Sequence, residues 1–470
     1  MSGLTLRAGS GIIHGLSRAL GLSPNELRRA WPFFLIYLLL FTALTIADGV
    51  SVSLFASRLG ADRLPAWYSA TAVLSLVMIT IYLTQATRRS SHQLFGWILA
   101  AVSCLFLAAW SIYYHWGGTG PLGTLFVTRE IALTMVLMHF GTFLQDYFER
   151  SELNRILPII YAGGRVGGII GGGALGWLSQ QLGTVNLVPA IVVLLVAAWI
   201  GIWIVSRVAA RPVDAEELVE AAGAPAAVPS ASSSNAVLQF LGQVRSCPLL
   251  GWLTISTLLF ISCRWFLAYQ YTSTFESHFD SDVELAGFIG RYTQFALLIS
   301  LVLQLFIVGR LVQWIGVSST HLLYSLLVLG GLAGNAFVAG LPVAIVSRFL
   351  ESELRFGLRN PVNQMMVNRF AKRTRIVVRG WSLGWLIPVG TLITSGVIAA
   401  LSQFGGPAAI AIVGLPLGTA FVYAANRVGR AYDGYQVTVD KPAPSSDCPA
   451  RPIEGKRLED CRGIASASAL

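Results

Sequence analysis

The sequence predicts an all-α membrane protein with twelve transmembrane helices in two pseudo-symmetric six-helix halves. Twelve apolar stretches of about 20 residues each fill most of residues 31 to 427, and this length crosses a hydrocarbon core. Of the 470 residues, 54% are hydrophobic and 12% are charged, whereas soluble proteins carry roughly twice that share of charge. The expected spans are 31–56, 65–84, 93–115, 121–147, 156–180, 185–207, 248–272, 285–308, 319–338, 341–361, 377–402 and 406–427.

Basic residues alternate between the connections. They include Arg28, Arg29, Arg88, Arg89, Arg207, Arg211, Arg310 and the run from Arg369 to Arg375, while connections such as 115–120 and 404–407 have almost none. By the positive-inside rule, both termini are cytoplasmic. The net charge of +10 therefore lies at cytoplasmic membrane edges, where it meets anionic lipid. We expect membrane lipid as a partner and no nucleic acid.

Composition divides the chain into five parts. Residues 1–30 are expected to form a cytoplasmic amphipathic N-terminus without a signal peptide. The six-helix halves cover 31–208 and 248–427. Between them, 209–247 has the composition of a flexible cytoplasmic linker, and 428–470 that of a disordered cytoplasmic tail. The five cysteines have no zinc-type spacing, so we expect no metal, no cofactor and no disulfide.

The two halves repeat a local pattern. Val127-Thr128-Arg129 in the fourth span matches Val346-Ser347-Arg348 in the tenth, and positions 129 and 348 differ by 219. The same offset places Arg150 on Arg369. A glycine-rich helix follows each match, and small residues let helix backbones approach closely. Repeated six-helix halves joined by a cytoplasmic linker are typical of major facilitator transporters, which bind substrate at the midplane between the halves.

Charged residues lie inside the predicted spans, where they are costly and mark functional sites. The candidate substrate-binding residues are Asp48, Arg129, Arg264, Arg291, Arg348 and Glu351. Intramembrane arginines outnumber carboxylates, and guanidinium groups bind phosphate or carboxylate through bidentate contacts. We therefore expect a small-molecule anion as the substrate. For any single residue the alternative is a structural ion pair, such as Glu351 neutralising Arg348.

Glu130 is the candidate for proton coupling. The offset places it on Phe349 in the second half, so this acid is an addition to the duplicated pattern. Its protonation would change the charge of the site and could link substrate release to a proton. The alternative is a fixed salt bridge from Glu130 to an arginine on a neighbouring helix.

Three stretches carry a family resemblance. Leu22 to Phe41, Arg155 to Leu187 and Arg359 to Arg375 are similar to the ATP/ADP translocase family of plastids and intracellular bacteria, and to its distant bacterial relatives in the major facilitator superfamily. The resemblance implies a twelve-helix transporter that moves nucleotides by counter-exchange or proton coupling, with Glu130 in the place of the family's fourth-helix acid. The family's exchangers have an Arg-Asp pair and a Lys on the first helix. This chain keeps only the aspartate, in Ala47-Asp48.

Signals of catalysis are missing from the sequence, which has no Walker loop, HExxH, GxSxG or CxxC motif, so we expect no enzyme. The leading prediction is a secondary active transporter of an organic anion, of the nucleotide or phosphorylated-metabolite class, in a bacterial inner membrane. Two alternatives stay open: a non-transporting membrane partner or assembly protein that retains the fold, and a lipid-headgroup flippase. The sequence does not decide the oligomeric state.

Overall fold

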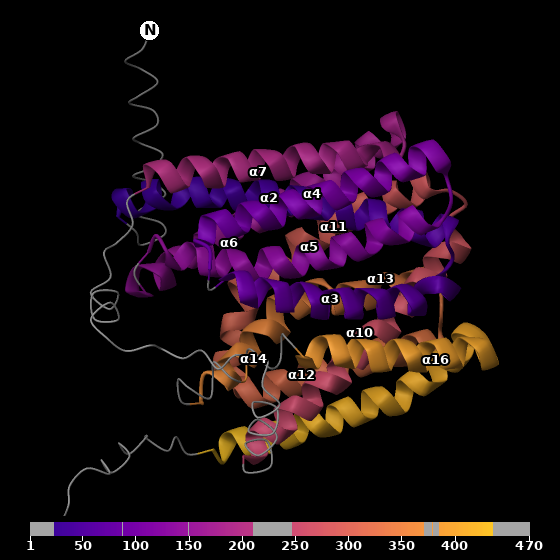
Figure 1. Cartoon of the computed structure of the whole chain (residues 1–470). Helices are drawn as coiled ribbons and strands as arrows, with labels where there is room; N and C mark the ends of the chain where they lie inside the picture. The colour runs from indigo at the N-terminus through magenta and orange to yellow at the C-terminus, as the bar shows by residue number, and fades with distance from the viewer. Residues whose placement is uncertain are drawn as a thin grey trace, which may run out of the picture. The chain divides into compact units, whose positions relative to one another are not determined.

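The computed structural model describes residues 23–86, 88–148, 150–209, 247–370, 378 and 385–435, and within these ranges every regular element is a helix (Figure 1). Most of the predicted N-terminal segment, the linker apart from its two end residues, and the tail beyond Tyr435 lie outside the described residues. The fold is therefore given by the two sets of apolar helices.

Six helices form the first half. They are α2 (Pro24–Arg58), α3 (Leu64–Ala86), α4 (Ser91–Trp116), α5 (Gly120–Gln145), α6 (Arg150–Leu182) and α7 (Val188–Val208), with the short 3-10 turns η1 (Ala61–Arg63) and η2 (Val185–Leu187) before α3 and α7. α2 begins at Pro24 rather than at the predicted residue 31 because Ser23 and Glu26 form a capping box. The Glu26 amide donates to Ser23 Oγ at 3.2 Å, and the Ser23 amide donates to Glu26 Oε2 at 2.8 Å.

The second half contains the remaining spans. Its helices are α10 (Pro248–His278), α11 (Asp282–Val302), α12 (Gly309–Phe337), α13 (Leu341–Glu351), α14 (Asn360–Val367) and α16 (Ile387–Asp433), and η3 (Leu303–Val308) and η4 (Arg355–Arg359) are π-helical segments. α16 ends at Asp433, beyond the predicted end at residue 427, because its last turns pack against α12. Val428 is buried, and Ser318 Oγ donates to Asp433 Oδ1 at 2.8 Å.

Nine helical stretches among the described residues are long and apolar enough to cross a membrane. Two of them hold two predicted spans each. The chain turns at Gly316 (φ 85°) within Asp282–Phe337 and at Gly406 (φ 59°) within Ile387–Asp433, and positive φ values favour glycine. The tenth predicted span, within Leu341–Val367, is not among the nine because it is broken into α13, η4 and α14 and carries several charges. Counted this way, the described segments match the twelve predicted spans.

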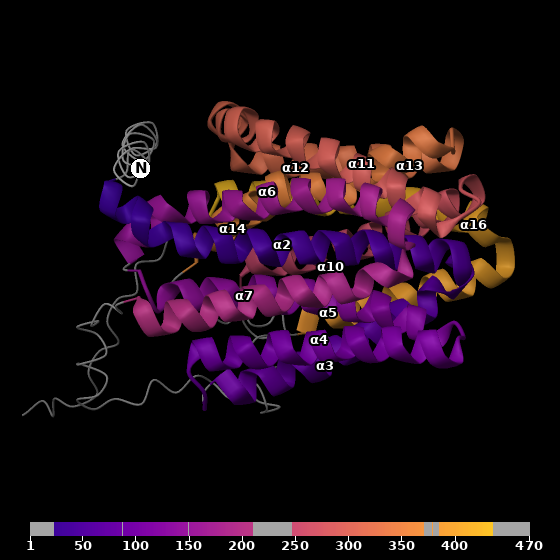
Figure 2. The same ribbon diagram turned by 90° about the horizontal axis from the view of Figure 1, so that it is seen from above.

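The two halves meet along several helix pairs. In the first half, α2 lies between α6 and α7 in both views (Figure 1, Figure 2). In the second half, α10 packs against α13 and α16. Across the boundary, α6 contacts α11, α3 contacts α16, and α2 contacts α11. Residues far apart in the sequence therefore meet at this boundary.

The glycine-rich run of α6 packs directly on the backbone of α2. A Cβ atom at Gly167 would lie 2.2 Å from the carbonyl oxygen of Leu38. One at Gly163 would lie 2.5 Å from that of Phe34. Thr42 Oγ1 also donates to the carbonyl oxygen of Gly167 at 3.0 Å. These distances leave no room for a side chain, so the glycines serve close helix packing.

Candidate substrate-binding site

The Asp48 carboxylate on α2 lies at the centre of the candidate site. Arg129 Nη1 on α5 lies 3.2 Å from Asp48 Oδ1. Arg348 Nη2 on α13 donates to Asp48 Oδ2 at 2.5 Å. α2 and α5 belong to the first half and α13 to the second. The two arginines of the repeated pattern therefore converge on one carboxylate from opposite halves.

Four further charged side chains extend this contact. Arg129 Nη1 donates to Glu130 Oε1 at 2.6 Å, and Arg264 Nη2 on α10 donates to the same oxygen at 3.4 Å. Arg264 Nε donates to Glu351 Oε1 at 2.6 Å, and Arg355 Nη2 lies 3.8 Å from that oxygen. The salt bridge expected as the alternative for Glu130 is thus present. We call the connected set the central charge cluster: Asp48, Arg129, Glu130, Arg264, Arg348, Glu351 and Arg355.

Aromatic rings cover the guanidinium groups of the cluster. The guanidinium carbon of Arg348 lies 5.5 Å from the centre of the Tyr271 ring, and that of Arg264 lies 4.3 Å from the centre of the Trp265 ring. The Trp265 ring contacts Tyr68 of α3, with centroids 4.1 Å apart. Cation–π contacts of this kind are most favourable away from water. The rings also place flat apolar surfaces beside the charges.

Burial differs within the central charge cluster. The side chains of Arg348 and Arg129 are 5% and 9% exposed, whereas the side chain of Asp48 is 32% exposed and is the most accessible member. The Nε atoms of both arginines are buried and have no hydrogen-bond partner. Each guanidinium therefore has one buried donor without a partner, and the partly exposed Asp48 carboxylate is the most accessible point of the cluster.

A second ion pair joins the halves through Glu353, which is a close sequence neighbour of the cluster residue Glu351. Arg165 Nη1 on α6 donates to Glu353 Oε2 at 2.9 Å, and its Nη2 donates to Gln304 Oε1 in η3 at 3.4 Å. Glu353 follows Glu351 by two residues. The sequence places Arg165 and Glu353 inside spans, but it cannot pair residues that are 188 positions apart.

Two arginines lie apart from the central charge cluster. Arg291, a predicted substrate-binding residue, is exposed on α11, and among the described residues no ion pair or hydrogen bond joins it to the cluster. Its role in binding substrate stays a prediction. Arg359 in η4 is buried with its guanidinium carbon 3.5 Å from the centre of the Phe260 ring, and no carboxylate in the described ranges pairs with it.

The structure resembles solved transporters. The nucleoside transporter NupG is 14% identical, with a TM-score of 0.57, and the match covers 87% of this chain and 99% of that chain. The human organic anion transporter MFSD10 is 13% identical, with a TM-score of 0.55, over 86% of this chain and 100% of that chain. A bacterial homolog of the human lysosomal transporter Spinster is 15% identical, with a TM-score of 0.50, over 87% and 98% of the two chains. No protein-family model matches the sequence, and no curated protein matches it.

The chain has the major facilitator fold. Identities this low show the fold alone, and the finer resemblance to ATP/ADP translocases stays a prediction. The apolar helices and the fold make this a multi-pass membrane protein. All three solved proteins are described as transporters.

In this major facilitator fold, the halves are also tied at one end of the bundle. Arg58 Nη2, at the end of α2, donates to Asp282 Oδ1 at the start of α11 at 3.0 Å. The Ala61 amide donates to Glu276 Oε2 on α10 at 2.6 Å. We call these two interactions the outer contact, because the arginine distribution predicts this end to be outside. Glu276 and Asp282 lie in an acidic stretch of the sequence, which does not show that their partners are in the other half.

Tyr271 and Tyr68, which lie beside the central charge cluster, were not among the predicted site residues. Tyr271 lies seven residues after Arg264, which is two helical turns along the same face of α10, and this spacing could have found it. Tyr68 on α3 had no such signal, because it meets Trp265 only through packing between the halves.

Proposed function

We propose that this protein is a secondary active transporter of an organic anion, working by alternating access of its two halves. One observation carries the proposal. Arg129 and Arg348, from opposite halves, share the partly exposed carboxylate of Asp48. An alternating-access transporter needs substrate contacts from both halves, and this pair supplies them.

In this proposal, the Asp48 carboxylate occupies the position that the anionic group of the substrate takes when it binds. A buried guanidinium without a counter-ion costs several kcal/mol, so Arg129 and Arg348 need an anion at every stage of the cycle. A phosphate or carboxylate of the substrate replaces Asp48, whose exposed side chain turns toward water. Exchanging one anion for another keeps the electrostatic cost of binding low, and bidentate contacts favour planar or tetrahedral oxyanions.

The charges of the cluster favour a substrate with two negative charges. Its arginines are Arg129, Arg264, Arg348 and Arg355, and its carboxylates are Asp48, Glu130 and Glu351. The cluster has one surplus positive charge, and displacement of Asp48 leaves two. A phosphate monoester carries about −1.5 to −2 at neutral pH and matches this surplus, whereas a monocarboxylate does not.

The rings beside the arginines support the nucleotide or phosphorylated-metabolite class. Tyr68, Trp265 and Tyr271 are buried in this structure, and movement of the halves apart would expose their faces next to the arginines, where a flat substrate group can stack. The sequence resemblance to ATP/ADP translocases supports the same class. So does the structural likeness to NupG, which is a nucleoside transporter.

Proton coupling, where it operates, is proposed at a carboxylate of the cluster. Glu130 is the candidate from the sequence, and it lies buried between Arg129 and Arg264. Asp48 is favoured by geometry, because it is partly exposed and shared by the two halves. Counter-exchange requires no change of protonation at Glu130 or Asp48. We place the protein in a bacterial inner membrane with both termini cytoplasmic, on the evidence of the arginine-rich connections.

Uptake by proteoliposomes tests the proposal. Labelled nucleotides, sugar phosphates and dicarboxylates are offered to the wild type, to Arg129→Gln and to Arg348→Gln. Arg310→Gln is the matched control, since Arg310 is exposed and lies outside the central charge cluster. We expect saturable uptake of a doubly charged anion that both cluster variants lose and the control keeps. If the panel produces no uptake and no anion-induced rise in melting temperature, the proposal is refuted.

The two alternatives give different results in the same preparation. A non-transporting partner protein co-purifies with another protein in fixed ratio and shows no stabilisation by anions. A flippase moves fluorescent phospholipids between the leaflets of the proteoliposome, and Arg129→Gln slows that movement. Anion uptake without lipid movement supports the transporter.

A further inference from the structure

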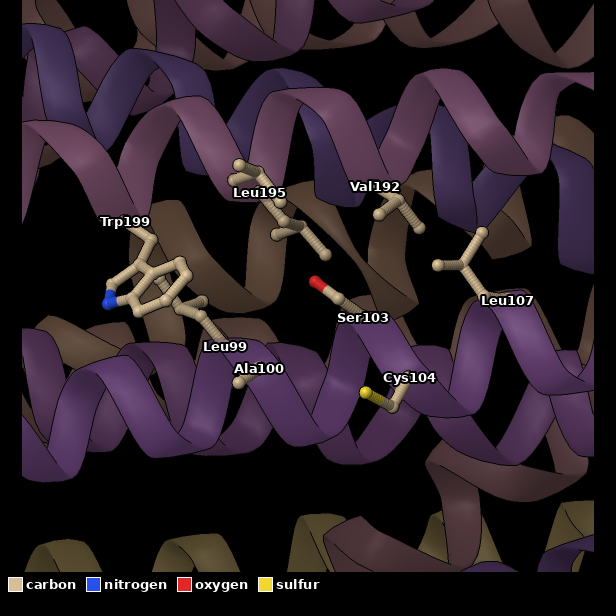
Figure 3. A pocket seen from close by; sticks show the side chains of 9 residues that line it. Leu99, Ala100, Ser103, Cys104, Leu107, Val192, Leu195 and Trp199 are labelled. Atoms are coloured by element: carbon tan, nitrogen blue, oxygen red, sulfur yellow. The ribbon is translucent and has the colours of Figure 1, made fainter.

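The first half carries an apolar groove between α4 and α7 (Figure 3). The groove has a volume of about 210 Å³. It is lined on α4 by Leu99, Ala100, Ser103 and Cys104, and on α7 by Leu195 and Trp199. Large apolar side chains around it, such as Val193 and Ile200, are exposed, as expected for a surface that faces lipid. We call this feature the α4–α7 groove.

Small residues on α4 create the groove. Gly96, Ala100 and Ser103 recur at helical spacing, so this face of α4 is shallow. The Trp199 indole packs on Gly96, where a Cβ atom would lie 2.6 Å from its Nε1. Because α4 begins and α7 ends on the predicted cytoplasmic side, Trp199 lies at the cytoplasmic end of the groove. The space therefore lies deep in the hydrocarbon region.

The cytoplasmic ends of the same two helices carry arginine–tryptophan pairs. The guanidinium carbon of Arg89 lies 4.9 Å from the centre of the Trp97 ring, and that of Arg207 lies 5.2 Å from the centre of the Trp203 ring. Both arginines are exposed, and Arg89 Nε donates to the neutral Gln85 Oε1 at 3.1 Å. Within the described part of the chain, no carboxylate pairs with either arginine. Tryptophan and arginine at this position mark the level of lipid headgroups.

The distance from the arginines to the groove is about the length of one acyl chain. Along α7, Trp199 and Leu195 are about 12 and 18 Å from Arg207, at about 1.5 Å per residue. One leaflet of the hydrocarbon core is about 15 Å thick. A phospholipid whose headgroup lies at the arginines therefore reaches the groove with an acyl chain of ordinary length.

We propose that the α4–α7 groove binds an anionic phospholipid of the cytoplasmic leaflet. Its headgroup lies between Arg89 and Arg207, and one acyl chain fills the groove. Two exposed guanidinium groups without carboxylate partners select a negative headgroup over a zwitterionic one. Since α7 also packs against α2, the bound lipid stabilises the packing of the first half. The inference is independent of the transported substrate.

Cys104 reports whether the groove is occupied, because its free thiol is exposed and lines the groove. Cys247, Cys263, Cys448 and Cys461 are first replaced by Ser. The rate of Cys104 alkylation by an apolar maleimide is then measured in micelles that contain phosphatidylglycerol or phosphatidylcholine. We expect phosphatidylglycerol to slow the reaction roughly thirtyfold more than phosphatidylcholine does, as two basic contacts would. Equal protection by both lipids overturns the headgroup assignment, and protection by neither overturns the site.

Two variants separate headgroup from chain. Arg89→Gln with Arg207→Gln removes the preference for phosphatidylglycerol, and both changes are at exposed positions. Arg427→Gln is the matched control, because the guanidinium carbon of Arg427 lies 5.1 Å from the centre of the Trp252 ring in the second half. This control variant should keep the preference for phosphatidylglycerol. Ala100→Phe fills the groove, and native mass spectrometry then finds less retained phosphatidylglycerol. An unchanged preference in the double variant contradicts the proposal even where Ala100→Phe fails to fold.

Discussion

Arg129 and Arg348 contact the two oxygens of one carboxylate from opposite halves of the protein. Arg129 Nη1 lies 3.2 Å from Asp48 Oδ1, and Arg348 Nη2 donates to Asp48 Oδ2 at 2.5 Å. One side chain of α2 thus joins the halves at the point where their sequence pattern repeats. Because Asp48 and Arg129 lie in the same half, separation of the halves at this point would break the contact between Arg348 and Asp48.

Replacing Arg348 by Ala should lower the free energy of unfolding by about 1.5–3 kcal/mol, because it removes a charge-assisted hydrogen bond to Asp48. Adding Asp48→Asn should recover part of that loss, since the side chain left with Arg129 as its one remaining partner in the cluster is then neutral. Thermal melting of the wild type, the single variant and the double variant measures both effects. A single variant as stable as the wild type would show that the pair is not buried as described.

Asp48→Asn should bind organic phosphates roughly tenfold more tightly, because the neutral side chain no longer competes for the two arginines. Ligand-induced shifts in melting temperature, compared for the wild type and the variant at one fixed pH, test this. Asp433→Asn, at the end of α16, is the control and should behave as the wild type. Weaker phosphate binding by Asp48→Asn would contradict the displacement mechanism.

Glu130→Gln tests proton coupling at the acid that lacks a counterpart in the second half. If Glu130 couples transport to a proton, the variant should keep exchange of internal for external anion but lose accumulation driven by a pH gradient. Both rates are measured in proteoliposomes across a pH series. An unchanged pH profile removes Glu130 as the coupling site and leaves Asp48 as the candidate.

Arg58→Gln should change stability by less than about 1 kcal/mol, because the Arg58 side chain is 38% exposed and such ion pairs are weak. It should nevertheless loosen the outer contact. Alkylation of a cysteine introduced at the buried Thr272 of α10, in a cysteine-free background, should become faster. Arg63→Gln is the control, since Arg63 bonds Thr119 within the same half. Equal alkylation rates in both variants would mean that the outer contact does not hold the halves together.

Gly167→Ala should destabilise the protein by about 1–3 kcal/mol, because the new Cβ atom would overlap the α2 backbone. Gly330→Ala should be neutral or stabilise by up to about 1 kcal/mol, since a Cβ atom there meets nothing within 4 Å and alanine favours helix. Comparing the two melting temperatures separates close packing from helix propensity. Equal effects would show that α6 does not need its glycine at this position.

The twelve spans and the surplus of positive charge at the site could be predicted along the chain. Apolar length, the alternation of arginines and the surplus of intramembrane arginine are properties of the residues themselves, and membrane-spanning segments must satisfy them wherever they pack. The sequence also predicted that Arg129 and Arg348 occupy corresponding positions in the two halves, because the same local pattern surrounds both residues. The resemblance to one transporter family added a substrate class to this prediction.

Only the tertiary structure decided which charges meet. It joined Asp48 to both arginines, paired Arg165 with Glu353, and left Arg291 outside the central charge cluster. Ion pairs depend on which helix faces oppose each other, and that is set by packing such as the glycine run of α6 on α2 and by the contacts of α2 and α6 with α11. Local sequence shows how deep a charged residue lies, but the rotation and neighbours of its helix are decided by the whole bundle.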